Sequence, residues 1–423
     1  MSRIIMMLSL IFVGETVFSL PFNVPLFFRP TVLEVFGVSN TQLGDMFAVY
    51  GVAAMLAYFP GGALADHFSA RTLIVTSLFL TAIGGLYMAT FPGVTEMRFL
   101  YGYWGVTTVF LFWGAFIKAT REWGGDRSQG LAFGLVEGGR GVVAASAASI
   151  GVFILAVYMP EDARFATPLE RESGLRMVVW YYTLLVFLTA VFAWFAIPAM
   201  KTVREVTFNP IKKMSVVLSR PIIWAQAAII VSAYCMYKGL GNYSLYAVQV
   251  LGMDEVEGAR LASYGAWTRP VAALIAGLIA DRFTAIRSIV VMFGILCISY
   301  GLWSLAVPSD SGNFIIYANF FTTYAAVYAL RAVYFALLEE NHTPMHLTGV
   351  AVGLVSVVGY TPDVFFAPIT GRILDANPGL VGFQHYFLLN SIIAALGVIA
   401  AVSLILLKRG DAAHWKDTIA EAK

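Results

Sequence analysis

Residues 62–75 read GALADHFSARTLIV and residues 277–290 read GLIADRFTAIRSIV, so one segment recurs at an offset of 215 residues. Each copy joins two long apolar stretches of the chain. The coinciding positions are Gly62/Gly277, Ala65/Ala280, Asp66/Asp281, Phe68/Phe283, Ala70/Ala285, Ile74/Ile289 and Val75/Val290. Because Gly, Asp and Phe recur in register with the apolar positions, the pattern indicates two halves of the chain with related folds.

The composition indicates a membrane protein. Of the 423 residues, 59% are hydrophobic and only 12% are charged, whereas a soluble globular protein carries about 25% charged residues. The net charge of +2 is too small to suggest a nucleic-acid partner. Cys235 and Cys297 lie in apolar runs, so we expect unpaired thiols and no disulfide framework.

Twelve stretches reach the length of about 20 apolar residues that a membrane-spanning helix needs. We expect an all-α integral membrane fold in which twelve transmembrane helices form two pseudo-symmetric six-helix bundles. The first stretch follows Arg3 and continues to Phe28 without a small-x-small cleavage site, so it predicts a retained helix rather than a signal peptide. The spans are 4–28, 41–65, 71–92, 97–118, 129–158, 174–198, 221–249, 256–280, 286–307, 313–337, 346–371 and 383–407.

Basic residues predict the orientation of these helices. With the N-terminus inside, most Lys and Arg residues of the loops fall on the cytoplasmic side, and the opposite loops hold chiefly Arg164 and Arg171. The positive-inside rule then places both termini in the cytoplasm of a multi-pass protein of a bacterial inner or plasma membrane. We expect a bundle over 1–200, a basic cytoplasmic linker over 201–220 and a second bundle over 221–423.

The pattern G-x-L-x-D-x-x-x-x-R, formed by Gly62, Leu64, Asp66 and Arg71, resembles the loop 2–3 signature of the major facilitator superfamily. RFLYG at 98–102 is similar to the helix 4 motif of that superfamily. His67 and Ser69 depart from the usual Arg and Gly. The resemblance covers the whole chain and implies two bundles that rock around a central site. It implies a conformational gate of Asp66, Arg71, Asp281 and Arg282, while the simpler alternative is that these charges only anchor the cytoplasmic helix ends.

Several ionisable side chains fall inside the predicted spans. Each central Arg or Lys costs about 2.5–3.5 kcal/mol on an insertion scale, so such residues face a wet cavity, an acidic partner or a substrate. A rise of ~1.5 Å per residue places three of them near the midplane: Glu15, Arg140 and Arg269. Two others, Lys238 and Asp363, lie near the centre or slightly outside it. Arg331 lies toward the cytoplasm, and Glu137 lies about a turn from Arg140.

These charges do not balance, since four cations face three acids and one positive charge remains. An anionic substrate would complete the set, and the planar fork of arginine suits a carboxylate, sulfonate or phosphate. Glu137 and Arg140 are i, i+3 neighbours and could instead pair within one helix. We expect Arg140 to be left for the substrate.

Polar side chains beside these charges predict a binding cavity. Tyr234 and Asn242 surround Lys238 in the seventh span, where Gly239 and Gly241 favour a local helix break. Tyr324 and Tyr328 share a helical stripe with Arg331, which favours a polar lumen over packing with satisfied hydroxyl groups. By the resemblance, helices 1, 4, 7 and 10 line the cavity.

Glu15, Asp363 and Glu137 are the candidates for proton coupling, with Glu15 preferred as the carrier. A carboxylate in a low-dielectric site binds a proton more readily, whereas a static ion pair with Arg or Lys would keep it charged. Pro362 directly precedes Asp363 and predicts a break in the eleventh helix. The five histidines lie in or near loops without metal-ligand spacing, and we expect neither metal nor cofactor.

The fifth span contains VEGGRGVVAASAAS at 136–149, a surface with few side chains that allows close helix contact. By the resemblance its neighbour is the eighth helix, so Arg140 and Arg269 would face each other and clamp an anion. The span lacks the Gly-Pro motif of proton-driven drug exporters. Residues 331–375 resemble the anion-handling branch around organophosphate antiporters, nitrate/nitrite porters and sugar-acid carriers.

We therefore predict a secondary active importer of a small organic anion, working by proton symport as a monomer in lipid. The alternative is an anion exchanger or a proton-driven exporter. A receptor or an intramembrane enzyme is disfavoured, because the sequence contains no nucleophile–base pair, metal cluster or cofactor motif.

Overall fold

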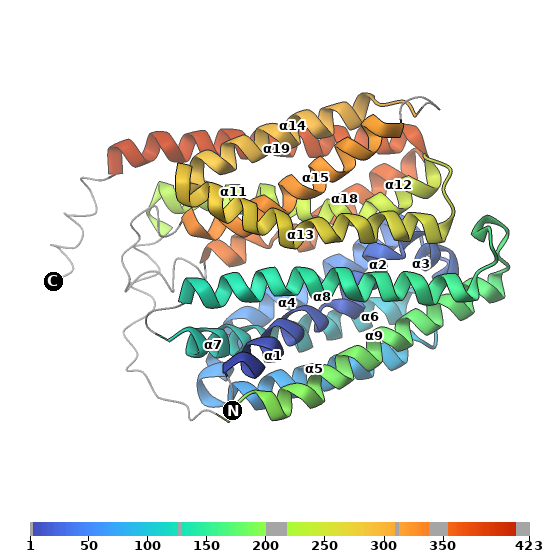
Figure 1. Cartoon of the computed structure of the whole chain (residues 1–423), viewed down its shortest axis with the longest axis horizontal. Helices are drawn as coiled ribbons and strands as arrows, with labels where there is room; N and C mark the ends of the chain where they lie inside the picture. Colours follow the sequence, from blue (N-terminus) through green and yellow to red (C-terminus); the bar gives the residue numbers. More distant parts are fainter. Residues whose placement is uncertain (1–2, 126–128, 200–217, 309–312, 338–353, 412–423) are drawn as a thin grey trace.

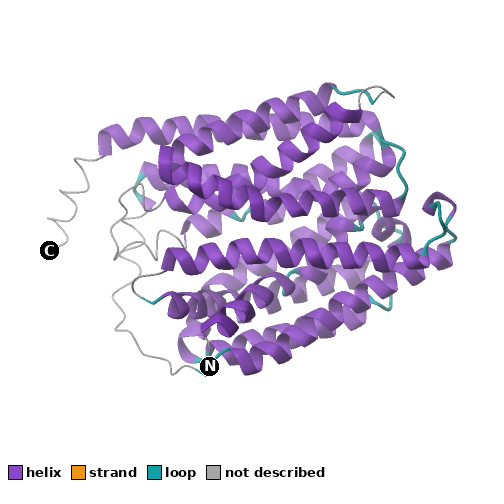
Figure 2. Ribbon diagram, in the orientation of Figure 1, coloured by secondary structure: helices purple, strands orange, loops and turns teal. Residues whose placement is uncertain are grey.

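The computed structural model describes residues 3–125, 129–199, 218–308, 313–337 and 354–411, and the regular structure in these ranges is helical (Figure 2). The predicted linker over 201–220 lies almost entirely outside them. Figure 1 shows long helices running roughly side by side in two groups, with α1 to α9 in one group and α11 to α19 in the other. The start of α1 and the end of α19 lie at the same end of the molecule.

The first group contains α1 (Arg3–Thr16), a π-helical turn (Ser19–Asn23), α2 (Val24–Phe27), α3 (Arg29–Phe36), α4 (Asn40–His67), α5 (Ala70–Met88), α6 (Val94–Gly105), a second π-helical turn (Val106–Leu111), α7 (Trp113–Gly124), α8 (Gln129–Tyr158), a 3-10 turn (Ala163–Phe165) and α9 (Pro168–Ala196). The second contains α11 (Pro221–Gly239), a 3-10 turn (Leu240–Asn242), α12 (Tyr243–Gln249), α13 (Glu255–Phe283), α14 (Ala285–Leu305), α15 (Asn313–Val333), a 3-10 turn (Tyr334–Ala336), α18 (Pro362–Ala376) and α19 (Leu380–Asp411).

Seven described helical spans are long and apolar enough to cross a membrane, and the pair Arg3–Thr16 and Ser19–Phe27, bent by 42°, makes an eighth. The spans below that threshold are α4, α13 and α15, which carry more polar residues, and α18, which with 15 residues is too short. Two of these helices, α4 and α13, pack along the other half of the molecule, against α18 and α8. Polar side chains are tolerated there because they face protein rather than lipid.

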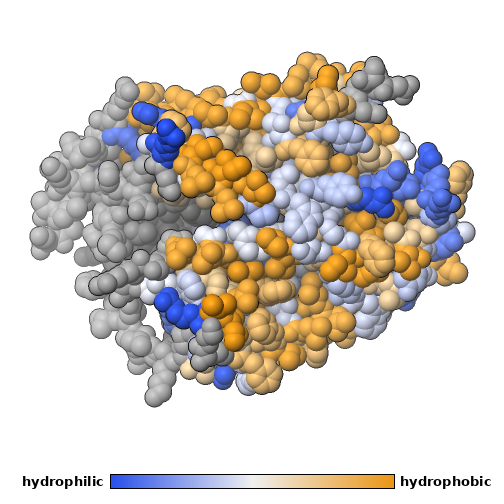
Figure 3. Space-filling model, viewed as in Figure 1, coloured by the Kyte–Doolittle hydropathy of each residue, from blue (hydrophilic) through white to orange (hydrophobic). Residues whose placement is uncertain are grey.

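Hydrophobic side chains cover much of the visible flank, and hydrophilic ones gather toward the two ends (Figure 3). Inside, one apolar core runs from Met6 to Ile197 and includes four residues of α13, while a second runs from Ile222 to Leu404. The apolar flank and the hydrophilic ends form the surface pattern that a bundle embedded in a bilayer requires.

Three helix boundaries differ from the sequence prediction. The first span is not one helix, because α1 ends at Thr16 and a π-helical turn follows. Residues 29–36, expected to be a loop, form α3. The sixth span begins earlier, at Pro168, because Thr167 and Glu170 form a capping box with proline in the first turn. A count of apolar residues misses such polar starts.

Small residues let the two groups approach each other closely. A Cβ on Gly141 of α8 would lie 3.0 Å from Cγ of Arg269 in α13, and one on Gly51 of α4 would lie 2.7 Å from the carbonyl carbon of Asp363. The expected contact between the fifth and eighth helices is thereby confirmed. The same approach brings Arg140 and Arg269 together.

Polar contacts between the groups also gather at the end away from the termini (Figure 1). Glu255 accepts hydrogen bonds from Thr31 at 2.8 Å and from Arg171 at 2.5 Å. Arg372 of α18 donates to Asp45 of α4 at 3.0 Å. These contacts, made by side chains of the described residues, hold the two groups together at that end.

Candidate functional site

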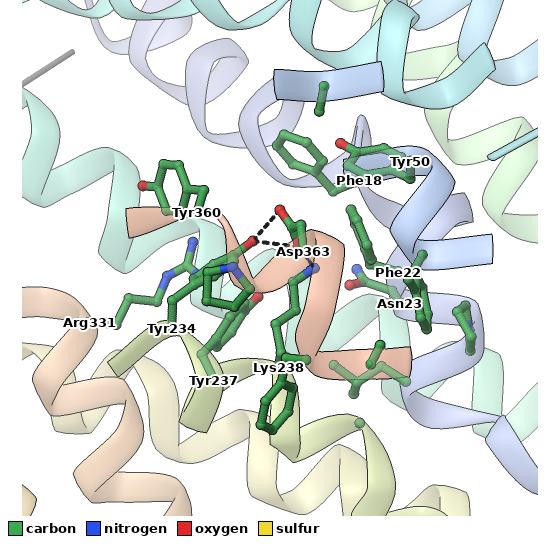
Figure 4. Close-up of a pocket in the computed structure, with 18 of the residues that line it drawn as sticks. Phe18, Phe22, Asn23, Tyr50, Tyr234, Tyr237, Lys238, Arg331, Tyr360 and Asp363 are labelled. Carbon is green, nitrogen blue, oxygen red and sulfur yellow. Dashed lines mark hydrogen bonds and ion pairs between the residues drawn. The ribbon is translucent and has the colours of Figure 1, made fainter. Parts of the chain in front are cut away.

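A cavity lies between the two groups of helices. Its walls come from both groups: α1 to α4, both π-helical turns, α7 and α8 on one side, and α11, the 3-10 turn after it, α15 and α18 on the other. Figure 4 shows Phe22, Asn23 and Tyr50 on one side, with Tyr234, Lys238 and Arg331 facing them. The lining mixes aromatic rings with charged groups, which is the character of a binding site for a small polar solute.

Three arginines and two glutamates form a network beside this cavity. Glu137 contacts Arg269 at 2.6 Å, Arg140 at 3.0 Å and Arg331 at 3.1 Å. Glu15 lies 3.3 Å from Arg140 and 3.3 Å from Arg269. The carboxylates therefore stand between the guanidinium groups, which would otherwise repel one another.

The two glutamates of this arginine network differ in exposure. The side chain of Glu137 is 29% exposed, whereas that of Glu15 is 5% exposed. Asn23 donates to the second oxygen of Glu15 at 3.4 Å. Glu137 is therefore the less buried of the two, whereas Glu15 is the one named among the residues that line the cavity.

A second charged cluster is formed by Lys238 and Asp363. The Lys238 ammonium lies 2.6 Å from Asp363, and the Tyr234 hydroxyl donates to the same carboxylate at 3.1 and 3.2 Å (Figure 4). The ammonium also lies 3.6 Å from the centre of the Phe22 ring, close enough for a cation–π interaction.

Helix breaks place these groups in the cavity. The seventh span is interrupted after Gly239 by a 3-10 turn through Asn242, and the eleventh span is interrupted at 360–361, directly before Pro362. Both predicted breaks are confirmed. The π-helical turn at Ser19–Asn23, which the sequence did not predict, presents Phe22 and Asn23 to the cavity.

The structure distributes the predicted substrate residues unevenly. Arg140, Arg331, Lys238, Tyr234 and Asn242 line the cavity. The predicted helical pair between Glu137 and Arg140, which the sequence left as an alternative, is present in the structure. We expected Arg140 to be left for the substrate, but in the structure it is paired with Glu137.

The other predicted substrate residues lie behind the wall. Arg269 is buried and reaches the site through the two glutamates. The Tyr328 ring lies 5.9 Å from the Arg269 guanidinium. Tyr324 is a correction, because its ring packs against Tyr243 and its hydroxyl donates to the Leu240 carbonyl oxygen at 3.3 Å. Its position in the helical stripe indicated that it faces a lumen, but the residue of this helix that lines the cavity is Arg331.

The predicted gate is described only in part, since the side chains of Asp66 and Asp281 lie outside the described residues. The Arg71 guanidinium lies 4.6 Å from the centre of the Trp194 ring, and exposed Arg282 lies 5.7 Å from that of Phe283. These contacts are on helix ends within each group.

Arg29 is the main site residue that the sequence did not reveal. It begins α3, is 5% exposed and lines the cavity. It falls just outside the first predicted span, where an arginine is typical of a loop. The signal that could have revealed it is its setting in FFRP at 27–30, an arginine directly after an apolar run. No group of three or more His, Cys, Asp or Glu side chains that could hold a metal occurs among the described residues.

A helical membrane bundle with a charged cavity between two halves is the architecture of a solute transporter. The family model of the Major Facilitator Superfamily matches residues 11–367. The chain therefore belongs to this superfamily, as its motifs predicted.

Curated relatives are similar over most of the chain. The inner membrane protein YqcE of Escherichia coli is 27% identical, with 92% of this chain and 91% of that protein covered. The inner membrane protein YihN of Escherichia coli is also 27% identical, over 94% and 93%. The probable nitrate/nitrite antiporter NarK1 of Thermus thermophilus is 25% identical, over 83% and 75%.

Solved structures share the fold. The nucleoside transporter NupG has a TM-score of 0.70 at 12% identity, covering 96% of this chain and 99% of that one. A bacterial homologue of the human lysosomal transporter Spinster, inward-facing and unoccupied, has a TM-score of 0.68 at 15% identity, covering 96% of both chains. The chain is thus a multi-pass membrane transporter of the superfamily's fold.

Proposed function

We propose that this protein is a secondary active importer of a small organic anion, driven by proton symport. The observation that carries the proposal is the charge of the buried site. Among the described residues, Arg140, Lys238, Arg269 and Arg331 contact Glu15, Glu137 and Asp363, four cations against three acids. The surplus of one favours a ligand with negative charge. Arg29 is left out of this count because Asp375 lies behind it, bound to the same Asn40 side chain.

The arginine network supplies the binding groups. Arg140 and Arg331 line the cavity and Arg269 lies behind them. A substrate carboxylate, sulfonate or phosphate that enters would accept hydrogen bonds from guanidinium groups now bound to Glu137. Charge-assisted bonds of this kind are shorter and stronger than neutral ones.

Competition between the substrate and Glu137 supplies the coupling. Glu15 and Glu137 already share these guanidinium groups, so a substrate carboxylate would be a third negative charge among them and would be repelled at short range. A proton on Glu137 removes the competing charge, so proton binding and anion binding favour each other. This mutual dependence is the thermodynamic requirement for symport.

Glu15 and Asp363 are the other two candidates for the proton. Glu15, the carrier preferred from the sequence, contacts two of the same arginines but is more deeply buried. Asp363 is held by Lys238 and Tyr234. In the proposed mechanism Glu137 takes the proton first because it is the most exposed of the three.

In the proposed mechanism, alternating access is a movement of two bundles, 1–200 and 221–423, joined by the linker 201–220. The contacts of Glu255 and of Asp45 close the end away from the termini, which is the outer end if both termini are cytoplasmic. Breaking them, with Asp66, Arg71, Asp281 and Arg282 pairing at the other end, would open the site outward. The protein works as a monomer, since each chain holds a complete site.

The alternative is an anion exchanger, or an exporter driven by protons. NarK1 is named as a probable antiporter for nitrate and nitrite, and an arginine network can accept an anion from either side. In an exchanger the incoming anion itself, rather than a proton on Glu137, displaces the outgoing one.

Purified protein in liposomes separates these functions. With gluconate as the probe, symport predicts accumulation that follows an imposed inward proton gradient and stops when the gradient is dissipated. Uptake that needs gluconate inside the liposome, with no effect of the pH gradient, would replace symport by exchange. Stabilisation of the detergent-solubilised protein by neutral sugars alone would overturn the anion site.

Variants locate the site in the same assay. Arg140→Ala and Arg269→Ala should each abolish uptake and ligand-induced stabilisation. Arg260→Ala, at an exposed position of α13, serves as the matched control and should behave as the wild type. If both cavity variants still bind and transport gluconate normally, the arginine network is not the anion site.

A further inference from the structure

Arg29 is a buried cation that the described part of the chain satisfies only in part. It is 5% exposed and lines the cavity. Its Nε donates to Oδ1 of Asn40 at 3.0 Å. Within the described residues, no hydrogen bond is made by its two terminal nitrogens, Nη1 and Nη2. A guanidinium so deeply buried requires acceptors for these donors.

Hydrogen bonds from Arg29 to Asn40, and from Asn40 to Asp375, fix the orientation of the Arg29 side chain. Asn40, at the start of α4, donates through its side-chain amide to Asp375 at 3.0 Å and through its backbone N–H at 3.1 Å. Thr41 donates to the second oxygen of Asp375 at 2.7 Å. Asp375 thus caps the start of α4 and fixes the Asn40 amide. Asn40 in turn fixes Arg29 through one nitrogen, Nε. A donor fixed in this way is preorganised for a ligand.

A second unsatisfied group lines the same cavity. Asn242, in the 3-10 turn that breaks the seventh span, is 4% exposed. Its buried side-chain oxygen has no hydrogen-bond partner among the described residues. The turn contacts α2, the short helix that leads directly into Arg29. An unpaired buried acceptor costs about 1–3 kcal/mol, so both groups favour a ligand that offers an acceptor to Arg29 and a donor to Asn242.

We propose that Arg29 and Asn242 form a second substrate subsite, distinct from the arginine network, which binds a hydroxylated or carboxylated part of the transported anion. A hydroxyl group can both accept from Arg29 and donate to Asn242, which neither a methyl nor a methylene group can do. The substrate class is then a polyhydroxylated organic anion of sugar-acid type rather than a simple inorganic or aliphatic anion. This inference rests on the proposed anion transport and narrows it.

Four probes test the subsite by direct binding to the purified full-length protein in detergent. Hexanoate carries the charge without hydroxyl groups, gluconate carries both, glucarate adds a second carboxylate, and glucose carries hydroxyl groups without charge. We expect gluconate and glucarate to bind at least about tenfold more tightly than hexanoate, the effect of one good hydrogen bond to a charged group. Glucose should bind most weakly.

Substitution of Arg29 tests whether this residue causes the preference for gluconate over hexanoate. Arg29→Gln should reduce the ratio of gluconate to hexanoate affinity to about one, while the affinity for hexanoate stays within about twofold of the wild type. Arg260→Gln, on the exposed face of α13, should leave both affinities unchanged. Should Arg29→Gln not fold, Arg29→Lys decides, since a single ammonium cannot replace the fork and the ratio must fall.

The outcomes separate this inference from the proposed function. Equal binding of hexanoate and gluconate by the wild type, or an unchanged ratio in both Arg29 variants, overturns the subsite and leaves anion transport standing. Glucose binding as tightly as gluconate overturns anion transport. If none of the four probes binds, both are rejected for this class of solute.

Discussion

Replacing Glu137 by glutamine removes the carboxylate that three arginine side chains share. Breaking a buried ion pair by deleting one partner costs about 3–5 kcal/mol. The Glu137 side chain is 29% exposed, so water screens part of the loss, and the amide keeps one acceptor. We therefore expect the free energy of unfolding to fall by about 2 kcal/mol.

For a chain of 423 residues, an unfolding entropy of about 2.1 cal/mol/K per residue converts this loss to a decrease in Tm of about 2 °C. The measurement is thermal unfolding of the purified protein at neutral pH. Glu161→Gln is the matched control, because Glu161 is exposed in the loop before α9. The Tm of the control variant should equal that of the wild type.

The same variant should bind anions more tightly, because its guanidinium groups no longer have Glu137 as a competitor. A tenfold gain in gluconate affinity adds about 1.4 kcal/mol of stabilisation at saturation, or about 1.5 °C of Tm. In liposomes Glu137→Gln should exchange gluconate but no longer accumulate it along a proton gradient. An unchanged Tm, unchanged affinity and intact proton-driven uptake would together refute the competition between Glu137 and substrate.

Three further variants test the surrounding structure. Gly141→Leu should lower the Tm by about 1–3 °C and abolish uptake, because its side chain would collide with Arg269; normal uptake would disprove the close helix contact. Asp375→Asn should weaken the closed end and increase labelling by a water-soluble thiol reagent of a cysteine introduced beside it, whereas unchanged labelling would show that its bonds do not hold that end. Lys238→Met should leave Asp363 without its ion-pair partner and reduce gluconate uptake at least about tenfold, with quantification in liposomes as the check.

Much of the fold could be predicted from local patterns. Long apolar stretches, the repeated loop segment and the small residues of 136–149 predicted membrane helices, two related halves and a close helix contact, while the partner of α8 in that contact, α13, came from the resemblance to the superfamily. These features depend on neighbouring residues along one helix or on a short motif, so one sequence is enough to reveal them. The π-helical turn after α1 and the helix α3 were missed, because no apolar count distinguishes a bent span from a straight one.

Apart from Arg29, the charged residues of the site were predictable, but their pairings were not. Charged residues in apolar spans identified Arg140, Arg269, Lys238, Arg331, Glu15, Glu137 and Asp363. Spacing along a helix could suggest only the pair of Glu137 and Arg140, and that pair is present. The contacts of Glu137 with Arg269 and Arg331 join residues more than a hundred positions apart. Tyr324 lies outside the cavity because it contacts Tyr243 and Leu240, which are also far from it in the sequence.

The sequence by itself determined the solvent of this protein, the helices and the kinds of charge that must be buried, because burying a charge in lipid is costly wherever the chain folds. Only the tertiary structure decided which carboxylate neutralises which guanidinium, and that Arg29 turns inward from the end of a span. Those choices depend on distances of a few ångströms between helices that meet only in the folded protein. The same distances leave donors of Arg29 and the acceptor of Asn242 without partners among the described residues.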